Sequence, residues 1–252
     1  MWRVVLGSAL ALWSQGAGAA TCEKVSYKDL GYTYCEVDAT AEELRLFLMD
    51  PGGNPYGTFA AVDARLAGQG KQLAFAMNAG MYHDDRSPVG HYREDGEETQ
   101  GVITSAGPGN FGMLPNGVFC FAPGRVEVIE STAYAEREGD NCPNATQSGP
   151  MLVIDGELHP RFLADSTSRY IRNGVGVNAD GTKAWFVMSD LPVTFHEFGS
   201  FFRDYLELPQ ALYFDGNISR LYAPSIGRND LGLRMGPIVG VVVDRPKDAA
   251  GN

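Results

Sequence analysis

Four segments of the chain place polar side chains directly beside a glycine, a combination that lets a ligand approach the backbone closely. Carboxylates can act as general bases or stabilise positive charge, while amides and hydroxyls can bind ligand hydroxyl groups or phosphate oxygens. Each segment alone is also typical of a tight turn, in which Asn and Asp commonly precede Gly. The segments are Asn78-Ala79-Gly80, Asn116-Gly117, Thr146-Gln147-Ser148-Gly149 and Asp215-Gly216-Asn217-Ile218-Ser219.

Asp215 is the strongest candidate for chemistry, because it follows the apolar run Ala-Leu-Tyr-Phe directly. A carboxylate at the end of such a run is costly to bury without a partner. Arg172, which precedes a glycine-rich strand start, is the best candidate for that partner. Its guanidinium could instead bind a phosphate group bidentately.

The histidines suggest weaker alternatives. His83, Asp84, Asp85 and His91 could coordinate a divalent metal, since carboxylate and imidazole suit several metals, or they could form a solvated loop. His159 could transfer a proton or lie at the surface. No metal site and no cofactor is predicted.

Short strands and turns must position these residues. Alternating or continuous apolar runs predict strands at 32–38, 44–50, 72–78, 211–216 and 236–244. Three hairpins are expected at 117–130, 149–160 and 174–190, with turns at Ala122-Pro123-Gly124-Arg125, Asp155-Gly156 and Ala179-Asp180-Gly181.

Two helices complete the expected fold. Thr58 caps a short helix that ends near Gly68, and Thr194 with Glu197 forms a capping box for a second. Phe195, Phe198, Phe202 and Tyr205 recur at helical spacing and are expected to face the core. The pattern predicts the α+β class: a single domain with a large, mostly antiparallel or mixed sheet and a few packed helices.

The overall charge argues against two classes of partner. The 252-residue chain has a formal net charge of −11 and no basic run. An acidic protein of this kind is not expected to bind nucleic acid or an anionic membrane as its main task.

The first residues resemble a secretory signal peptide. Arg3 precedes a short apolar run, and Ala17 and Ala19 offer a cleavage pattern. The run is too short to span a bilayer, so membrane insertion is not expected. The predicted organisation is a signal peptide at 1–19, a domain at 20–245 and a disordered tail at 246–252, in a secreted or periplasmic protein.

Export makes disulfides the natural state of the four cysteines. Cys22, Cys35, Cys120 and Cys142 allow three connectivities, of which the two local bridges, Cys22–Cys35 and Cys120–Cys142, are favoured. A zinc site is the alternative, but no C-x-x-C pair is present.

Four motifs in order resemble the phosphodiester glycosidase family: "MNAGMY", "ATQSGPMLVIDGELHP", "RNGVGV" and "ALYFDGNISRLYAP". The resemblance runs from about Tyr32 to Val243. Family members typically have Asn-Gly-Gly where this chain has Asn78-Ala79-Gly80, and often Asp-Gly-Gly-x-Ser at 215–219. Both second glycines are therefore replaced, at Ala79 and Asn217.

The resemblance implies an exported hydrolase that cleaves a sugar from a phosphodiester at the anomeric C1–O bond. Asp215 and Arg172 would be catalytic, and the substrate, a sugar phosphate or glycan phosphodiester, would contact the remaining candidates. These are Asn78, Gly80, Asn116, Gln147, Ser148, Gly149 and Ser219.

Two other functions remain open at this point. The replaced glycines favour a non-catalytic protein that binds envelope or other glycans on the same fold. A metal-dependent phosphodiesterase that cleaves the P–O bond is the third possibility.

Overall fold

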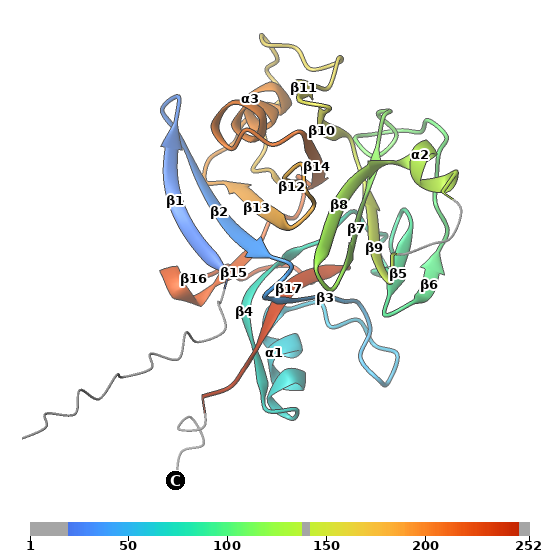
Figure 1. Cartoon of the computed structure of the whole chain (residues 1–252), viewed down its shortest axis with the longest axis vertical. Helices are drawn as coiled ribbons and strands as arrows, with labels where there is room; N and C mark the ends of the chain where they lie inside the picture. Colours follow the sequence, from blue (N-terminus) through green and yellow to red (C-terminus); the bar gives the residue numbers. More distant parts are fainter. Residues whose placement is uncertain (1–19, 138–141, 247–252) are drawn as a thin grey trace, which may run out of the picture.

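The computed structural model describes residues 20–137 and 142–246. The predicted signal peptide, 1–19, and residues 247–252 of the predicted tail lie outside the described residues. Within that part the chain forms antiparallel strand pairs and a few short helices, which confirms the α+β class (Figure 1).

The strands form three sheets rather than one large sheet. The first is β1 (Thr21–Tyr27), β2 (Leu30–Asp38), β13 (Lys183–Ser189), β12 (Asn173–Val177), β14 (Gln210–Asp215), β10 (Met151–Ile154) and β11 (Glu157–Leu158), in that spatial order. The second is β16 (Arg228–Asn229), β15 (Leu221–Ala223), β4 (Lys71–Asn78), β17 (Ile238–Asp244) and β3 (Glu43–Phe47). The third is β6 (Glu97–Gln100), β5 (Tyr92–Glu94), β9 (Asn144–Ser148), β7 (Gly117–Ala122) and β8 (Arg125–Glu130).

The three sheets enclose one main core. Phe75 of β4, Phe119 of β7 and Phe186 of β13 come from different sheets, yet their rings meet. The Phe75 and Phe186 ring centroids are 5.0 Å apart, and those of Phe119 and Phe186 are 5.6 Å apart. Strongly twisted strands cannot continue indefinitely as one open sheet, and splitting into packed sheets lets every inner face bury apolar side chains.

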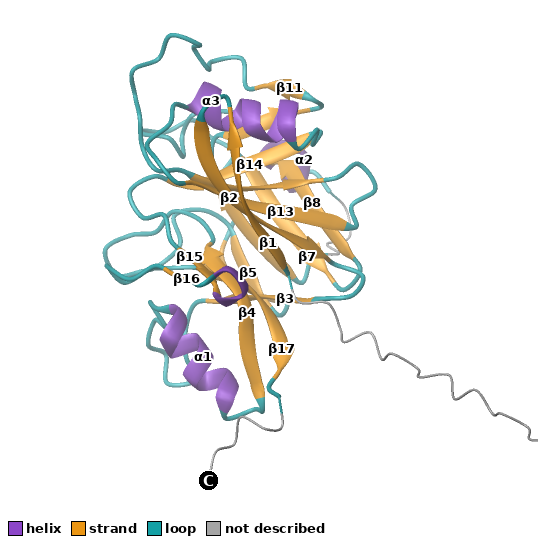
Figure 2. Cartoon of the chain, turned by 90° about the vertical axis from the view of Figure 1, so that its left-hand side faces the viewer, coloured by secondary structure: helices purple, strands orange, loops and turns teal. Residues whose placement is uncertain are grey.

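Two helical segments cover opposite ends of this core (Figure 2). Helix α1 (Phe59–Ala67) begins after Thr58, whose side chain accepts from the Ala61 amide, and its C-cap is Gly68, as predicted. It packs against β4, which explains why β4 is apolar on both faces. The short helices α2 (Ser131–Ala135) and η2 (Pro224–Ile226, a 3₁₀ turn) follow β8 and β15.

Helix α3 (Phe195–Ser200) begins with the predicted capping box of Thr194 and Glu197. It continues as a π-helical turn, η1 (Phe201–Tyr205), in which the Leu206 amide bonds to the Phe201 carbonyl. This wider turn shifts the helical register. Phe201 therefore faces inward and is buried, whereas Tyr205, which was predicted to face the core, is exposed.

Both predicted disulfides are present. Cys22–Cys35 joins paired positions of β1 and β2, and Cys120–Cys142 joins β7 to the segment before β9. None of the described helices is long and apolar enough to cross a membrane.

Candidate active site

Asp215 ends β14 and is held by the turn that follows it. Its side chain is only 8% exposed, and its Oδ1 accepts from the amides of Gly216, at 2.6 Å, and Asn217, at 2.9 Å. Within the described residues Oδ2 has no hydrogen bond. Burial raises the pKa of Asp215, while the amides of Asn217, Gly216 and Ile218 act in the opposite direction. The site thus presents a nearly buried carboxylate that is oriented by the amides of its own turn and whose pKa is raised by burial.

A buried amide–hydroxyl cluster fixes the turn beside Asp215. Asn173 of β12 lies opposite Asp215 in the sheet, and its Nδ2 donates to Ser219 Oγ at 2.9 Å and to Asn78 Oδ1 at 3.0 Å. Asn78 Oδ1 also accepts from the Arg220 amide at 3.0 Å. Ser219 Oγ donates to the Ile171 carbonyl at 2.9 Å. The ends of β4, β12 and β14 therefore meet at the predicted site.

Asn78 and Ser219 are brought beside Asp215 as the sequence predicts, but their contacts differ from the expectation. Both were predicted to bind substrate, whereas their polar atoms are occupied by Asn173 and by the backbone. They position the turn that carries the carboxylate. Asn173 itself was not predicted, although "RNGVGV" contains it.

Tyr213, two residues before Asp215 on β14, fills the space beside Gly216. A Cβ at residue 216 would overlap the Tyr213 hydroxyl, so packing against Tyr213 requires a glycine there. Packing against Tyr213 is therefore one reason for the glycine at this position, and access of a ligand to its backbone stays a prediction. The Tyr213 hydroxyl is buried and makes no hydrogen bond of good geometry within the described residues, but it lies close to the side chains of Arg172 and Asn110.

Arg172 does not pair with Asp215, which corrects the sequence prediction. Its Nε donates to the Val193 carbonyl at 2.9 Å and its Nη2 to the Ser168 carbonyl at 3.1 Å, and its guanidinium carbon lies 3.6 Å from the centroid of the Phe195 ring. The side chain is buried, and Nη1 has no partner among the described residues. Two of the three guanidinium nitrogens therefore donate to backbone carbonyls, which leaves only Nη1 without such a bond for a phosphate contact.

Arg172 still belongs to the surroundings of Asp215, through Tyr213. Burial is the main cause that raises the pKa of Tyr213; the Arg172 charge lowers it and the Asp215 charge raises it. The Arg172 guanidinium carbon lies 5.4 Å from the centroid of the Tyr213 ring. Tyr213 is thus close enough to both charges to interact with each.

The third polar segment forms the end of β9, which is the central strand of its sheet. Ser148 Oγ donates to the Phe214 carbonyl at 2.7 Å, and Thr146 Oγ1 donates to the Ala79 carbonyl at 2.5 Å. These bonds join β9 to the ends of β14 and β4. Ser148 therefore lies next to Asp215 in space, as predicted, but uses its hydroxyl to hold the adjacent backbone.

Gln147 points to the other face of β9 and has no group left for a ligand. Its Oε1 accepts from the amides of His91, at 2.9 Å, and Ile103, at 3.0 Å. Its Nε2 donates to the Ile103 carbonyl at 2.6 Å and to Ser131 Oγ at 2.8 Å. The predicted substrate contact of Gln147 is not supported by this geometry.

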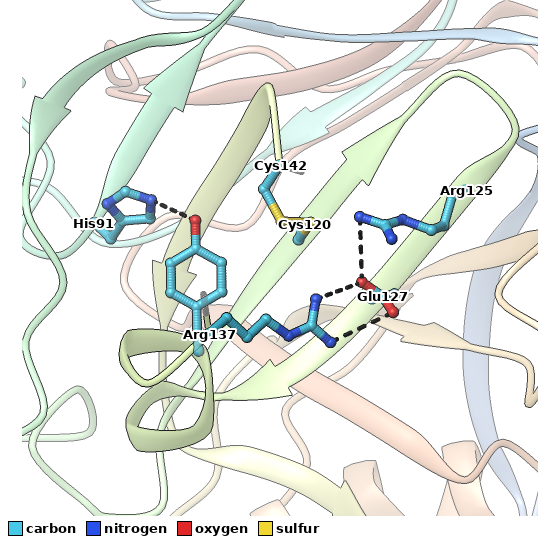
Figure 3. Close-up of a disulfide and its surroundings, with 7 residues drawn as sticks. His91, Cys120, Arg125, Glu127, Arg137 and Cys142 are labelled. Atoms are coloured by element: carbon cyan, nitrogen blue, oxygen red, sulfur yellow. Dashed lines mark hydrogen bonds and ion pairs between the residues drawn. A yellow bond between two sulfur atoms is a disulfide. The ribbon is translucent and has the colours of Figure 1, made fainter. Parts of the chain in front are cut away.

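His91 lies in the same cluster as Gln147. Its Nδ1 is 2.8 Å from the Gln100 carbonyl and its Nε2 is 2.9 Å from the Tyr134 hydroxyl. Figure 3 shows His91 near the Cys120–Cys142 disulfide. Burial lowers the pKa of His91.

Backbone conformation and close packing within the protein account for the two predicted glycines Gly80 and Gly149. Gly80 has a φ of 132° and lies against Thr146 of β9. A Cβ on Gly149 would lie 2.6 Å from the Asn116 Cβ. Asn116 is buried, donates to the Phe111 carbonyl at 3.1 Å, and leaves its Oδ1 without a partner in the described chain.

Two residues that were not predicted, Tyr82 and Arg220, complete the surroundings of Asp215. Burial raises the pKa of Tyr82, the Asp215 charge adds to this rise, and the charges of Arg86 and Arg220 oppose it. A sequence signal for Arg220 is its position directly after Ser219 in the motif. Asp215 is therefore flanked by two tyrosines, Tyr213 and Tyr82, and each of them interacts with a buried arginine.

The alternative metal site is not assembled. His83, Asp84 and Asp85 lie in an exposed turn, whereas His91 is buried and already bonded. In the described residues no three His, Cys, Asp or Glu side chains are grouped as metal ligands. His159 is buried rather than at the surface, with its Nε2 3.1 Å from the Leu114 carbonyl.

A wide groove lies elsewhere on the molecule. It has a volume of about 800 Å³ and is lined by residues of the β2–β3 connection and the β7–β8 turn. Its most unusual group is Glu42, whose Oε1 is buried without a partner and whose pKa is raised to about 7 by burial. None of the predicted site residues lines it.

Comparison with known proteins supports the assignment made from the motifs. The phosphodiester glycosidase family model matches residues 71–248. The uncharacterized protein YigE of Escherichia coli is 34% identical over 186 residues, which cover 74% of this chain and 72% of YigE.

Two solved structures share the fold at 13% identity and a TM-score of 0.59. One is the catalytic domain of zebrafish N-acetylglucosamine-1-phosphodiester alpha-N-acetylglucosaminidase, auto-inhibited by its pro-peptide, where the match covers 88% of this chain and 81% of that one. The other is a hypothetical protein from Synechocystis, where the match covers 89% of this chain but only 62% of that chain, less than two thirds of its length. The match of the family model over most of the chain shows that this protein belongs to the phosphodiester glycosidase family.

Proposed function

We propose that this protein is an exported hydrolase that cleaves the anomeric C1–O bond of a sugar phosphodiester. The observation that carries the proposal is Asp215, a nearly buried carboxylate in the family's Asp-Gly motif, of which only Oδ1 accepts from the Gly216 and Asn217 amides. Its raised pKa suits a group that accepts a proton during turnover.

The proposed reaction needs only one carboxylate because of its leaving group. Water attacks C1 and gives a proton to Asp215, while the C1–O electron pair leaves with the phosphate monoester. The second pKa of such a monoester is about 6, so it departs with less help from a general acid than an alkoxide would need. This explains why the usual glycosidase pair of carboxylates is dispensable here.

The groups around Asp215 would support this step by position and charge. The amides of Gly216 and Asn217 bind Oδ1 and so fix the orientation of the carboxylate. The unpartnered Tyr213 hydroxyl and Arg172 Nη1 lie next to the turn. Buried polar atoms without partners are rare in proteins and commonly mark sites where a ligand or water completes the network.

Hydrolysis in water enriched in oxygen-18 tests the proposal. The mature protein is incubated with an alkyl sugar-1-phosphodiester, and the products are analysed by mass spectrometry. Label in the sugar supports C1–O cleavage. Label in the phosphate indicates P–O cleavage and overturns the proposed bond. Binding without turnover supports the non-catalytic alternative, which the replacements at Ala79 and Asn217 favour.

Export is the second part of the proposal, and the two disulfides support it because such bonds persist in oxidising compartments. Mass spectrometry of protein recovered outside the cytoplasm is expected to show cleavage near Ala19 and no free thiol. Four free thiols in that fraction contradict it.

A further inference from the structure

The loop after β16 exposes two large apolar side chains beside the candidate site. Leu231 is 86% exposed and Leu233 is 71% exposed, more than any other large hydrophobic side chain of the described residues. Gly232 lies between them with a φ of 145°, a conformation that strongly favours glycine. Clustered exposed apolar side chains commonly mark a binding surface.

The same loop packs against a buried arginine that forms no ion pair within the described residues, although the Asp230 charge acts on it from a greater distance. Arg220 is 6% exposed, and its guanidinium makes no hydrogen bond or ion pair with any described residue. A Cβ on Gly232 would lie 2.5 Å from Arg220 Nη2, so the loop contacts the guanidinium directly. The neighbouring Asp230 carboxylate instead binds Arg228 and the Leu221 amide. A buried cation without a partner is costly, which makes Arg220 a natural site for an anion.

Tyr82 connects this arginine to Asp215. Its hydroxyl donates to the Arg234 carbonyl at 3.1 Å, and its ring packs against Gly236. Both contacts are to residues that closely follow Leu231 and Leu233 in the sequence, so Tyr82 packs against the same loop. Tyr82 interacts electrostatically with both Asp215 and Arg220. Tyr82 is therefore close to both Asp215 and Arg220, and the apolar loop contacts Arg220 directly.

We propose that the substrate is an amphiphilic phosphodiester, whose phosphate binds Arg220 and whose hydrocarbon chain lies on Leu231 and Leu233. This inference rests on the proposed function, because it assigns the group on the far side of the phosphate from the sugar. The charge of Arg220 selects an anionic head, and the two leucines bury the first methylene groups of the chain. Arg172 differs in that its guanidinium is packed against the Phe195 ring and donates to the Val193 and Ser168 carbonyls.

Direct binding of alkyl phosphates tests the inference without any turnover. Affinities of the full-length mature protein for methyl phosphate, dodecyl phosphate and dodecyl maltoside are measured by calorimetry below the micelle concentration. Dodecyl phosphate is expected to bind at least tenfold more tightly than methyl phosphate, because each buried methylene is favourable. It should also bind at least tenfold more tightly than the uncharged dodecyl maltoside.

Three variants separate the two contacts. Leu231→Ser combined with Leu233→Ser should reduce the affinity for dodecyl phosphate to that for methyl phosphate. Arg220→Gln should weaken the binding of both phosphates about tenfold or more. If Arg220→Gln folds poorly, Arg220→Lys is measured in its place and should show a smaller loss of affinity, because lysine keeps the positive charge. Leu163→Ser is the matched control, because Leu163 is 65% exposed on the loop after β11 and should have no effect.

Each outcome decides between the claims. Equal affinities for dodecyl and methyl phosphate overturn the inference, as does tight dodecyl phosphate binding that survives the double leucine substitution. Equal binding of dodecyl maltoside shows a general apolar contact without phosphate selection, and also overturns it. Hydrolysis of short-chain sugar phosphodiesters with no effect of chain length leaves the proposed function intact while this inference fails. The expected alkyl phosphate binding without any hydrolysis supports the binding site while the proposed function fails.

Discussion

Two buried polar clusters lie on opposite faces of β9, and they differ in how completely their atoms are hydrogen-bonded. The Gln147 cluster, which contains His91, Ser131 and Tyr134, gives every polar atom of the Gln147 amide a partner. In the Asp215 cluster the Tyr213 hydroxyl and Arg172 Nη1 have no hydrogen bond of good geometry, although the two side chains interact with each other. Both clusters contain amide, serine and tyrosine side chains, but only the Asp215 cluster also contains a carboxylate and a guanidinium.

This difference in hydrogen bonding distinguishes a cluster that stabilises the fold from a cluster that is expected to serve turnover. A fully bonded buried network rigidifies the fold, because breaking any contact leaves a polar atom unsatisfied. A network with free atoms costs stability, and proteins retain such a cost mainly where a ligand or chemistry uses it. We therefore expect changes in the Gln147 cluster to affect stability and changes in the Asp215 cluster to affect turnover.

Asp215→Asn should have the largest effect. The amide cannot accept the proton of the attacking water, so kcat is expected to fall about 100-fold or more, as for loss of a general base. The thermal midpoint at pH 7 should be unchanged or slightly higher, because an isosteric neutral group replaces a buried charge. Steady-state kinetics and thermal unfolding are measured on one preparation. A well-folded variant with near-normal kcat excludes Asp215 from the reaction.

Gln147→Ala should give the reverse result. Removing the amide leaves the His91 and Ile103 amides and the Ile103 carbonyl without their partners, so the free energy of unfolding is expected to fall by about 2–4 kcal/mol. The KM of the folded fraction should stay within twofold of the wild type. Ser131→Ala, which removes only one of the four bonds, serves as a milder control. A large rise in KM without loss of stability returns Gln147 to the substrate site.

The elements of the fold could be predicted because their signals are local. Thr58 and Thr194 cap helices through hydrogen bonds within three residues, and Asp155-Gly156 forms its turn within a single hairpin. The two disulfides also close short loops. Strand β9 was missed because its residues are polar, and their partners, such as the Phe214 and Ala79 carbonyls, are distant in sequence.

The site could be predicted only as a location. Sequence order places Asn78, Ser148 and Asp215 at strand ends, and the structure brings those ends together. The direction of each side chain depends on pairing between distant strands. Arg172 and Arg220 illustrate this limit: both are isolated arginines near strand ends, and only the fold shows that one is enclosed by Phe195 while the other borders an exposed loop.

The two clusters should also respond to pH in opposite directions. Burial lowers the pKa of His91, so its contribution to stability is present above its unfolded value, about 6.5, and is lost as the pH falls below it. Burial raises the pKa of Asp215, so its contribution is present below about pH 4 and is lost as the pH rises through its folded value.

Unfolding free energies of the wild type, His91→Gln and Asp215→Asn between pH 3.5 and 8 check these signs. Relative to His91→Gln, the wild type should lose stability as the pH falls from 7 to 5.5. Any gain from Asp215→Asn should be present at pH 7 and disappear near pH 3.5. Parallel curves for all three proteins contradict the assigned pKa directions.

Tyr134→Phe should have the smallest effect. Because the Gln100 carbonyl can only accept, His91 must carry its proton on Nδ1, and the Tyr134 hydroxyl must donate to Nε2. The variant keeps the ring and removes this donor, which leaves Nε2 buried without a partner at a cost of about 1 kcal/mol. Tyr205→Phe, at an exposed tyrosine, is the control and should leave the unfolding free energy unchanged. Both variants should retain wild-type kcat, since the affected cluster is on the far face of β9. A fall in kcat of tenfold or more in Tyr134→Phe, with stability intact, shows that the bonded cluster takes part in turnover and that hydrogen-bond satisfaction does not separate the two regions.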